Sequence, residues 1–155
     1  MDELTQLVPD VSHIIRVVIR LLTALAVGTA IGLQRELTHK SAGLRTHMLL
    51  ALGTALFVIA AAEGGMESES LARVIQGIAT GLGFLGGGAI LKLTEQREVH
   101  GLTTAAGIWM TAAASVAAGM GQIFVAVLST VLGLVVLVVF HRFEKQLGLR
   151  PKDHE

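Results

Sequence analysis

Apolar residues in this chain are gathered into five long runs separated by short polar gaps. The runs cover residues 17–33, 46–62, 74–91, 102–118 and 123–140. Each comes close to the ~17–25 residues that a helix needs to cross the hydrocarbon core of a bilayer. A soluble domain of this size does not need five such runs. The pattern therefore predicts an all-α membrane protein, a five-span transmembrane helical bundle.

Basic residues fall almost entirely into alternate gaps. They occupy the first gap, the third gap and the C-terminal tail, whereas the second gap has Arg73 beside three glutamates and residues 119–122 carry no charge. Lysine and arginine accumulate on the cytoplasmic side of membranes. We therefore expect the N-terminus outside and the C-terminus in the cytoplasm. The first residues are acidic, which favours a retained first helix over a cleaved signal peptide.

Composition narrows the class of function. The chain has 155 residues, equal numbers of basic and acidic side chains and no cysteine. We expect a single domain over residues 1–155, without disulfides or thiolate metal sites. The basic residues are spread over short loops, which argues against nucleic-acid binding. Its six histidines lack metal-ligand spacing, and no nucleophile–base pattern is present, so we expect no metal, no cofactor and no enzymatic activity.

Small residues recur at helical spacing. The fourth run carries them at every fourth position: Thr103, Gly107, Thr111, Ser115 and Gly119. The third run holds glycine pairs at the same spacing. Since helices in lipid associate where small residues let backbones approach, we expect the third and fourth helices at the centre and the fifth at the periphery. Trp109 is expected to pack against glycines of a neighbouring helix, with Gly81 and Gly83 leaving room.

Three consecutive glycines, Gly86, Gly87 and Gly88, have two interpretations. One is plain helix packing. The other is a break in the third helix, because each glycine costs a helix about 1 kcal/mol relative to alanine. Broken membrane helices occur where the freed backbone lines a cavity or a binding site.

A shift of 58 positions aligns several residues of the first two runs with residues of the next two. Gly28 then matches Gly86, and Gly43 matches Gly101. The shift preserves topology, so it predicts two parallel copies of a helical hairpin followed by a fifth helix. Such repeats occur in transporter folds.

Charged residues within the runs are few. Arg20 is the deepest, and it either faces other helices or extends to the outer headgroups. Arg73 and Gln76 lie one turn apart at the outer end of the third run, where they bond neighbouring carbonyls or cap the bundle. No Asp or Glu lies within a run. That absence counts against an autonomous secondary transporter.

Polar residues also gather at the cytoplasmic ends of the runs. Thr46 and Thr104 open the second and fourth helices, where a hydroxyl caps free N–H groups. Glu36 and Arg45 flank one loop and are placed to pair. This face is either functional, as an interaction surface or as the mouth of a small-ligand pocket, or simply a set of helix caps in contact with lipid.

Four segments, in order, resemble the MgtC/SapB family of bacterial inner-membrane proteins. They are residues 31–36, 42–47, 76–88 and 101–109, with Arg73 just ahead of the third. The resemblance covers about residues 15–140 and implies a five-span domain in the inner membrane. With Arg20 added from its depth, the candidate functional residues are Glu36, Arg45, Thr46, His47, Arg73, Gln76, Gly77, Gly81, Phe84, Gly86, Gly88, Gly101, Thr103, Thr104 and Trp109.

The family is associated with growth in low magnesium, survival of pathogens in macrophages and inhibition of the F-type ATP synthase. This sequence departs from the family pattern in two ways, which limit the functions that the resemblance implies for it. Position 34 is Gln where many members have Glu, and we expect this chain to lack the soluble C-terminal domain of longer members.

We therefore expect a non-enzymatic membrane protein that adapts the cell to low magnesium or host and acid stress. It would act through helix–helix contacts in the bilayer, as a homodimer or with another inner-membrane complex such as the ATP synthase. The alternative is a small channel or transporter subunit for Mg²⁺ or another ion. That alternative predicts a water-accessible cavity lined by residues such as Arg20, Gln76, Thr103, Thr111 and Ser115.

Overall fold

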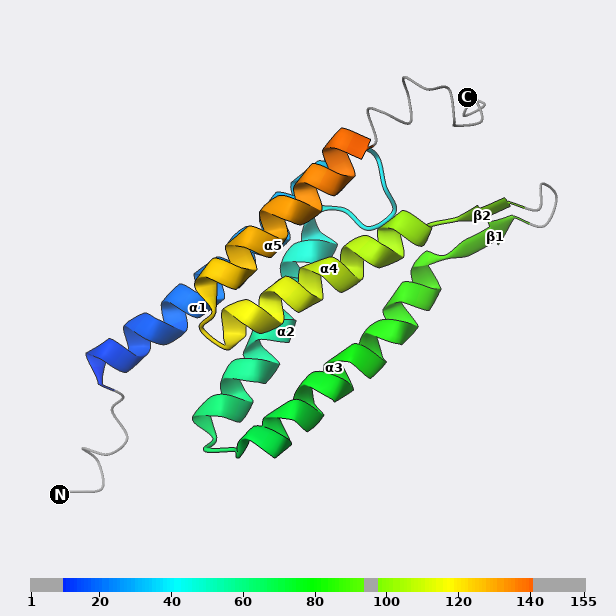
Figure 1. Ribbon diagram of the computed structural model, residues 1–155. Helices are drawn as coiled ribbons and strands as arrows, with labels where there is room; N and C mark the ends of the chain where they lie inside the picture. Colours follow the sequence, from blue (N-terminus) through cyan, green and yellow to red (C-terminus); the bar gives the residue numbers. More distant parts are fainter. Residues whose placement is uncertain (1–9, 94–97, 141–155) are drawn as a thin grey trace.

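The computed structural model describes residues 10–93 and 98–140, and within them the five apolar runs form helices (Figure 1). The helices are α1 (Val11–Leu37), α2 (Leu44–Glu63), α3 (Ser68–Ala89), α4 (Leu102–Gly119) and α5 (Ile123–Val135). A π-helical turn, Val136–Phe140, extends α5. Two short antiparallel strands, β1 (Leu91–Leu93) and β2 (Glu98–His100), connect α3 to α4, with Leu91 opposite His100.

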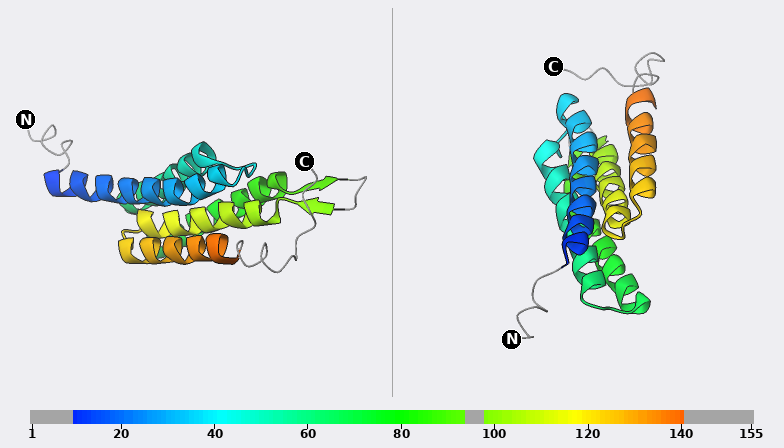
Figure 2. Two further views of the ribbon diagram at one scale, coloured as in Figure 1. Left: turned by 90° about the horizontal axis from the view of Figure 1, so that it is seen from above. Right: turned by 90° about the vertical axis from the view of Figure 1, so that its left-hand side faces the viewer.

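Successive helices run in opposite directions, so their connections alternate between two ends of the bundle (Figures 1 and 2). The α1–α2 loop, the β1–β2 ribbon and the end of α5 lie together, and we call this the ribbon end. The start of α1 and the α2–α3 and α4–α5 turns lie at the opposite end, the turn end.

The core is built around α4, which packs against each of the other four helices. Its central place follows the expected stripe, because Gly107, Thr111, Ser115 and Gly119 are all buried. Only Thr103, at the start of the stripe, is exposed. The core side chains are small, with alanines of α1, α2 and α4 among the most buried: Ala24, Ala51, Ala55, Ala112, Ala114 and Ala118.

Close backbone contacts hold α1, α2 and α4 together. A Cβ atom added at Gly28 of α1 would lie 2.6 Å from the carbonyl oxygen of His47 and 2.8 Å from the Cβ of Ala51. One added at Gly119 of α4 would lie 2.9 Å from the Cβ of Val58. Since real Cβ atoms do not approach so closely, these glycines are required by the crossings.

The place of α3 differs from the prediction, because this helix is peripheral rather than central. Only Leu82 and Gly86 of α3 are buried. A Cβ added at any of the other glycines of this helix would have no atom within 4 Å, which holds for Gly77, Gly81, Gly83, Gly87 and Gly88. Glycine content therefore does not mark burial in this helix. The expectation for α5 was correct, since only Ala126 and Thr130 of that helix are buried.

The proposed break at Gly86, Gly87 and Gly88 is wrong. The α-helix runs through all three glycines to Ala89, and the N–H of Ile90 still bonds the carbonyl of Gly87 at 3.2 Å. The glycines form the last turn of the helix, so the chain leaves the helix at its end, where the ribbon begins.

The two halves of the suspected repeat share equivalent contacts. Gly43 and Gly101 each precede the first residue of a helix as its N-cap. Gly28 meets His47 and Ala51, and Gly86 meets Ala105 and Trp109. Residues 105 and 109 are residues 47 and 51 shifted by the same 58 positions. The superposition of the hairpins stays a prediction.

Three helices, α1, α2 and α4, are long and apolar enough to cross a membrane. Helix α3 has 22 residues but is not among them, and the apolar stretch Ile123–Val139 is shorter. Large apolar side chains are exposed around the bundle, including Phe84, Phe124 and Leu49. Such a surface fits a hydrocarbon environment. The five-span topology and its orientation remain predictions.

Candidate functional site

A buried arginine and a buried histidine meet near the ribbon end of the bundle. Arg35 lies in the last turn of α1, on the face that also buries Gly28 and Ile31. His47 lies in the first turn of α2. Their exposed fractions are 3% and 0%. Full burial of two ionisable side chains among apolar helices is unusual and marks a candidate functional site.

Two threonines of α4 bind these side chains. Nη2 of Arg35 donates to Oγ1 of Thr104 at 3.1 Å. Nδ1 of His47 lies 2.7 Å from Oγ1 of Thr111. The Thr111 hydroxyl donates to the carbonyl oxygen of Gly107 at 2.9 Å, so it accepts from His47, and the histidine proton is assigned to Nδ1. We call Arg35, His47, Thr104 and Thr111 the polar cluster.

The polar cluster joins three helices and is continued along α4 by Ser115. Ser115 is fully buried, and its hydroxyl donates to the carbonyl of Thr111 at 2.7 Å. Both hydroxyls thus bond their own helix, which is a common way to satisfy such groups in an apolar interior. The stripe on α4 supplies packing and hydrogen bonds to α1 and α2, rather than the wall of an open cavity.

Hydrogen bonding in the polar cluster is incomplete. Nε of Arg35 and Nε2 of His47 are buried without a hydrogen-bond partner. Among the described residues, no carboxylate lies within 4.0 Å of Arg35. A buried charge without a counter-charge is costly. The cluster therefore contains one unused donor, the N–H at Nε of Arg35, and one unused acceptor, Nε2 of His47 with the ring proton on Nδ1.

Beside the cluster, Glu36 closes the α1–α2 loop. Its Oε2 accepts the N–H of Leu44, the first residue of α2, at 2.9 Å. The structure has Glu36 capping α2 and records no ion pair between it and Arg45, which is exposed. A carboxylate at a helix N-terminus is favourable because of the helix dipole.

The expected threonine caps are wrong. Gly43 and Gly101 are the N-caps of α2 and α4, and neither helix start has a side-chain cap of its own. Thr46 is exposed in the first turn of α2, and Thr104 instead accepts from Arg35. Gly101 has φ +93°, a conformation that glycine adopts without strain.

The candidate residues of α3 lie away from the polar cluster. Arg73 pairs with Glu69 on the same helix at 2.7 Å, with both side chains exposed. Gln76, Gly77, Gly81, Phe84 and Gly88 are exposed as well. Only Gly86 faces the core. The ring of Trp109 packs there, with Nε1 3.6 Å from an added Cβ, and not at Gly81 or Gly83 as expected.

Arg20 lies at the turn end, far along α1 from Arg35. Its Nη1 is 3.6 Å from Oε1 of Glu63, and His13 bonds the same carboxylate. Its guanidinium also lies against Gly121 in the α4–α5 turn. Arg20 thus faces neighbouring helices, which was one of its two interpretations. The residues expected to line an ion cavity do not share one site. Thr111 and Ser115 are buried within the bundle, whereas Gln76 and Thr103 are exposed. Arg20 pairs with Glu63 at the turn end.

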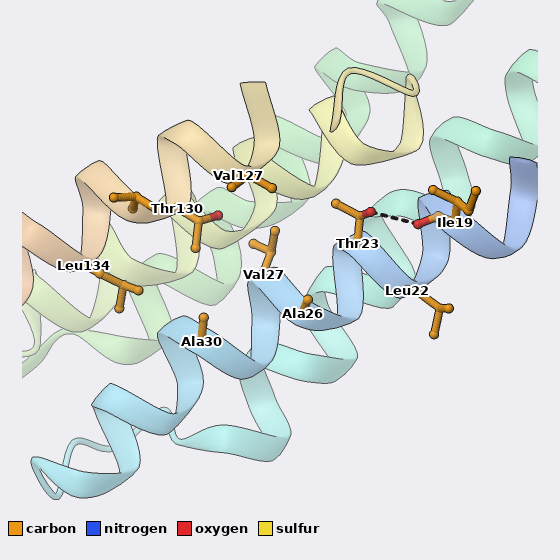
Figure 3. Close-up of a pocket in the computed structure, with 10 residues that line it drawn as sticks. Ile19, Leu22, Thr23, Ala26, Val27, Ala30, Val127, Thr130 and Leu134 are labelled. Atoms are coloured by element: carbon orange, nitrogen blue, oxygen red, sulfur yellow. Dashed lines mark hydrogen bonds between the residues drawn. The ribbon is translucent and has the colours of Figure 1, made fainter. Parts of the chain in front are cut away.

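Two grooves on the described surface offer little polar chemistry. A groove of about 480 Å³ between α1 and α5 is lined mainly by aliphatic side chains (Figure 3). Its hydroxyls, on Thr23 and Thr130, donate to the carbonyls of Ile19 and Ala126 on their own helices. A second groove of about 510 Å³ lies between α2 and α3 and is also mainly apolar. Both suit lipid chains or helices better than polar ligands.

Two members of the polar cluster, Arg35 and Thr111, were missing from the set of predicted site residues. The signal for Arg35 is its position on the buried face of α1, four residues after Ile31 and seven after Gly28. Thr111 lies on the recognised α4 stripe, but nothing in the spacing identified His47 as its partner. His47 and Thr104 were predicted, and the structure brings them together with Arg35 and Thr111.

Comparison with known proteins agrees with a membrane protein. The model of the MgtC family matches residues 21–146. The putative magnesium transporter YhiD of Escherichia coli K12 is 39% identical over 137 residues, covering 84% of this chain and 63% of that protein. Protein SrpB of Synechococcus elongatus is 40% identical over 142 residues, covering 84% and 78%. Protein MgtC of Salmonella choleraesuis is 33% identical over 138 residues, covering 89% and 58%.

The chain thus spans about three fifths of the length of YhiD and of MgtC. No solved structure matches it.

Proposed function

This chain belongs to the MgtC family, and we propose that it is a non-enzymatic, multi-pass protein of the bacterial inner membrane that acts through helix–helix contacts. Its partner is a second copy of the chain, forming a homodimer, or another membrane protein. The observation that carries this proposal is an unpartnered polar surface on α3.

That surface, the α3 stripe, consists of residues that follow one another at three- or four-residue spacing, all exposed: Glu69, Arg73, Gln76, Thr80, Gly83 and Gly87. Gly83 and Gly87 have nothing within 4 Å of an added Cβ. Glycine weakens a helix by about 1 kcal/mol per residue, and polar side chains gain nothing from hydrocarbon. Both features are typical of helix contacts in membranes, where small residues permit close approach and polar ones bond across the interface.

The α3 stripe is complementary to itself. In a parallel pair of copies related by a two-fold axis, Arg73 of each copy would lie about one helical turn from Glu69 of the other. The glycines nearer the ribbon end would let the two backbones approach. Covering the stripe in this way also supports α3 as a fourth spanning helix and the bundle as a five-span protein. The basic residues in alternate gaps favour an N-terminus outside and a C-terminus in the cytoplasm.

The proposed physiological setting rests on the family. We propose that the protein serves adaptation to low magnesium or host and acid stress by modulating another complex, with the F-type ATP synthase as a candidate. The similarity to YhiD, named a putative magnesium transporter, supports ion transport as a second candidate function. The buried Arg35 argues against a Mg²⁺ path beside the polar cluster, because a fixed positive charge in an apolar interior repels a divalent cation.

Cross-linking in membranes tests the proposed interface. The chain has no cysteine, so single-cysteine variants report one position each. Oxidation of Gly83→Cys is expected to give a covalent dimer. Val131→Cys on α5, which is 51% exposed, is the matched control and should stay monomeric. A cross-link of Gly83→Cys to a different membrane protein, identified by mass spectrometry, would point to the second kind of partner.

Failure of Gly83→Cys to cross-link, or equal cross-linking of both variants, would contradict the proposed interface. Liposomes holding the purified protein provide the other arm of the test. Mg²⁺ flux into such liposomes without any added partner would favour the transport function instead.

A further inference from the structure

The groove of about 510 Å³ between α2 and α3 is continued by a wider one of about 680 Å³ at the ribbon end. The two adjoin because Leu49, Leu50 and Leu85 line both of them. Buried apolar residues of one cluster form their floor: Ala42, Leu82 and Ile108. We call the two together the α2–α3 groove.

Glycines on the facing sides of the two helices keep this groove open. Gly53 of α2 and Gly77 and Gly81 of α3 line the narrower part, and Gly88 lines the wider part. A Cβ added at any of them would have no atom within 4 Å. An unfilled gap beside apolar side chains forfeits their dispersion contacts, so we expect a ligand to fill the groove in a membrane. None of its lining residues belongs to the α3 stripe, so the groove and the stripe are separate surfaces.

The length of the α2–α3 groove matches one acyl chain. Its lining residues on α2 run from Thr46 to Phe57, which is about 16 Å along the helix axis. That is about half of the ~30 Å hydrocarbon core, the depth of one leaflet. Among the residues that line the narrower part, Thr54 alone has a polar side chain, and it is buried. A hydrocarbon chain therefore suits this part better than a helix that bonds its neighbour through polar groups.

Polar groups gather at the ribbon end of the α2–α3 groove. Ser41 and Thr46 line the wider part, and the structure records no hydrogen bond of either hydroxyl to another described residue. Arg45 is exposed and lies one turn before Leu49, on the same face of α2. Among the described residues, no carboxylate lies within 4.0 Å of Arg45. The acid of the same loop, Glu36, already accepts a backbone N–H at the start of α2.

An arginine beside two hydroxyls suits the oxygens of a phosphate ester, because charge-assisted hydrogen bonds to phosphate are strong. Basic side chains at the membrane surface also attract anionic lipids. We propose that the α2–α3 groove binds one anionic phospholipid, with an acyl chain between the two helices and the phosphate beside Arg45, Ser41 and Thr46. A zwitterionic lipid carries its own cation, so it binds less tightly. This inference goes beyond the proposed function and does not depend on contacts made by the α3 stripe.

Native mass spectrometry of the delipidated protein in detergent tests the proposal. Phosphatidylglycerol and phosphatidylcholine with identical acyl chains are the two lipid probes, and inorganic phosphate is the third. One phosphatidylglycerol is expected to bind each chain, about tenfold more tightly than phosphatidylcholine, because of the additional charge-assisted contact. Inorganic phosphate should not displace it, since the acyl chain supplies most of the contact.

The variant Gly81→Leu fills the groove. Its side chain starts where an added Cβ meets nothing, so the fold should be kept while the acyl chain is excluded. We expect loss of the bound lipid with either headgroup. Gly83→Leu is the matched control, because it makes the same change on the α3 stripe, at a position that is equally open. It should bind phosphatidylglycerol like the natural chain.

The variant Arg45→Gln tests the headgroup contact. It should weaken phosphatidylglycerol binding about tenfold, to the level of phosphatidylcholine, and leave phosphatidylcholine binding unchanged. Arg73→Gln is the control, since Arg73 is also exposed but lies on the α3 stripe near the turn end. It should change neither affinity.

Equal binding of the two lipids by the natural chain would overturn the proposal, as would a Gly81→Leu protein that keeps its lipid. Displacement by inorganic phosphate would mean a site for a free anion instead. A disulfide from oxidised Gly81→Cys to another protein would mean that a helix fills the groove. Because Gly83→Cys reports the stripe and Gly81→Cys reports the groove, either proposal can fail while the other stands.

Discussion

Helices α1, α2 and α4 form a closed unit, whereas α3 lies against it with most of its surface uncovered. The closed unit buries its small residues against neighbouring backbones, as Gly28 and Gly119 do. Helix α3 is richer in glycine but buries only Leu82 and Gly86. The same residue type thus has two roles. In the closed unit it permits crossings within one chain, and on α3 it leaves an uncovered surface, which we propose makes contacts between chains.

The largest expected difference between the two regions comes from adding one methyl group. Gly28→Ala would place a Cβ 2.6 Å from the carbonyl oxygen of His47, so α1 and α2 must separate. We expect a loss of about 2 kcal/mol or more in the free energy of unfolding. Denaturant titration in detergent, followed by circular dichroism, measures it.

Gly53→Ala in α2 is the control for that change, because nothing lies within 4 Å of its added Cβ. It should stabilise the protein by up to about 1 kcal/mol through helix propensity. A Gly28→Ala protein as stable as the natural chain would contradict the close crossing of α1 and α2.

Sequence patterns predicted the packing of the closed unit better than the position of α3. The apolar runs located all five helices, and the α4 stripe identified the central one. The predicted central position of α3 was wrong, because residue spacing does not distinguish a small residue that packs within the chain from one on an uncovered surface. Arg35 was missed for a related reason. An arginine near a loop is expected to extend into the headgroups, and only the fold brings His47, Thr104 and Thr111 to the same place.

A substitution in the polar cluster is expected to have an intermediate effect on the free energy of unfolding. Thr111→Val removes the acceptor of the His47 Nδ1–H and leaves that donor buried without a partner, since His47 is fully buried. The expected loss is about 1–3 kcal/mol in the free energy of unfolding. The measurement is the same denaturant titration.

Thr80→Val on α3 is the control for Thr111→Val, because it makes the same change of side chain in another helix. Thr80 also donates to the carbonyl four residues before it at 2.9 Å, but it is exposed and, among the described residues, bonds no other helix. Its replacement should change stability by less than about 0.5 kcal/mol. Equal losses from the two variants would mean that the contact between His47 and Thr111 contributes nothing beyond the bond within α4.

The smallest effect on the free energy of unfolding is expected from two arginine–glutamate pairs near the turn end. Arg73 and Glu69 form an exposed pair within α3, whereas Arg20 and Glu63 join α1 to α2, with side chains only 23% and 34% exposed. Exposed pairs between neighbouring turns contribute about 0.3–0.5 kcal/mol. Arg73→Gln should therefore lower the stability of the detergent-solubilised monomer by no more than that, and the loss should vanish at high salt.

Arg20→Gln should lower stability more, by about 1 kcal/mol, because it also removes the guanidinium packed against Gly121. High salt should reduce this loss only in part, since packing is not screened. If Arg73→Gln proved the more destabilising change in the monomer, α3 would be held to the bundle by charge, and its stripe would not be free for a second chain. If it weakens only the dimer, the division between a closed unit and a contact helix stands.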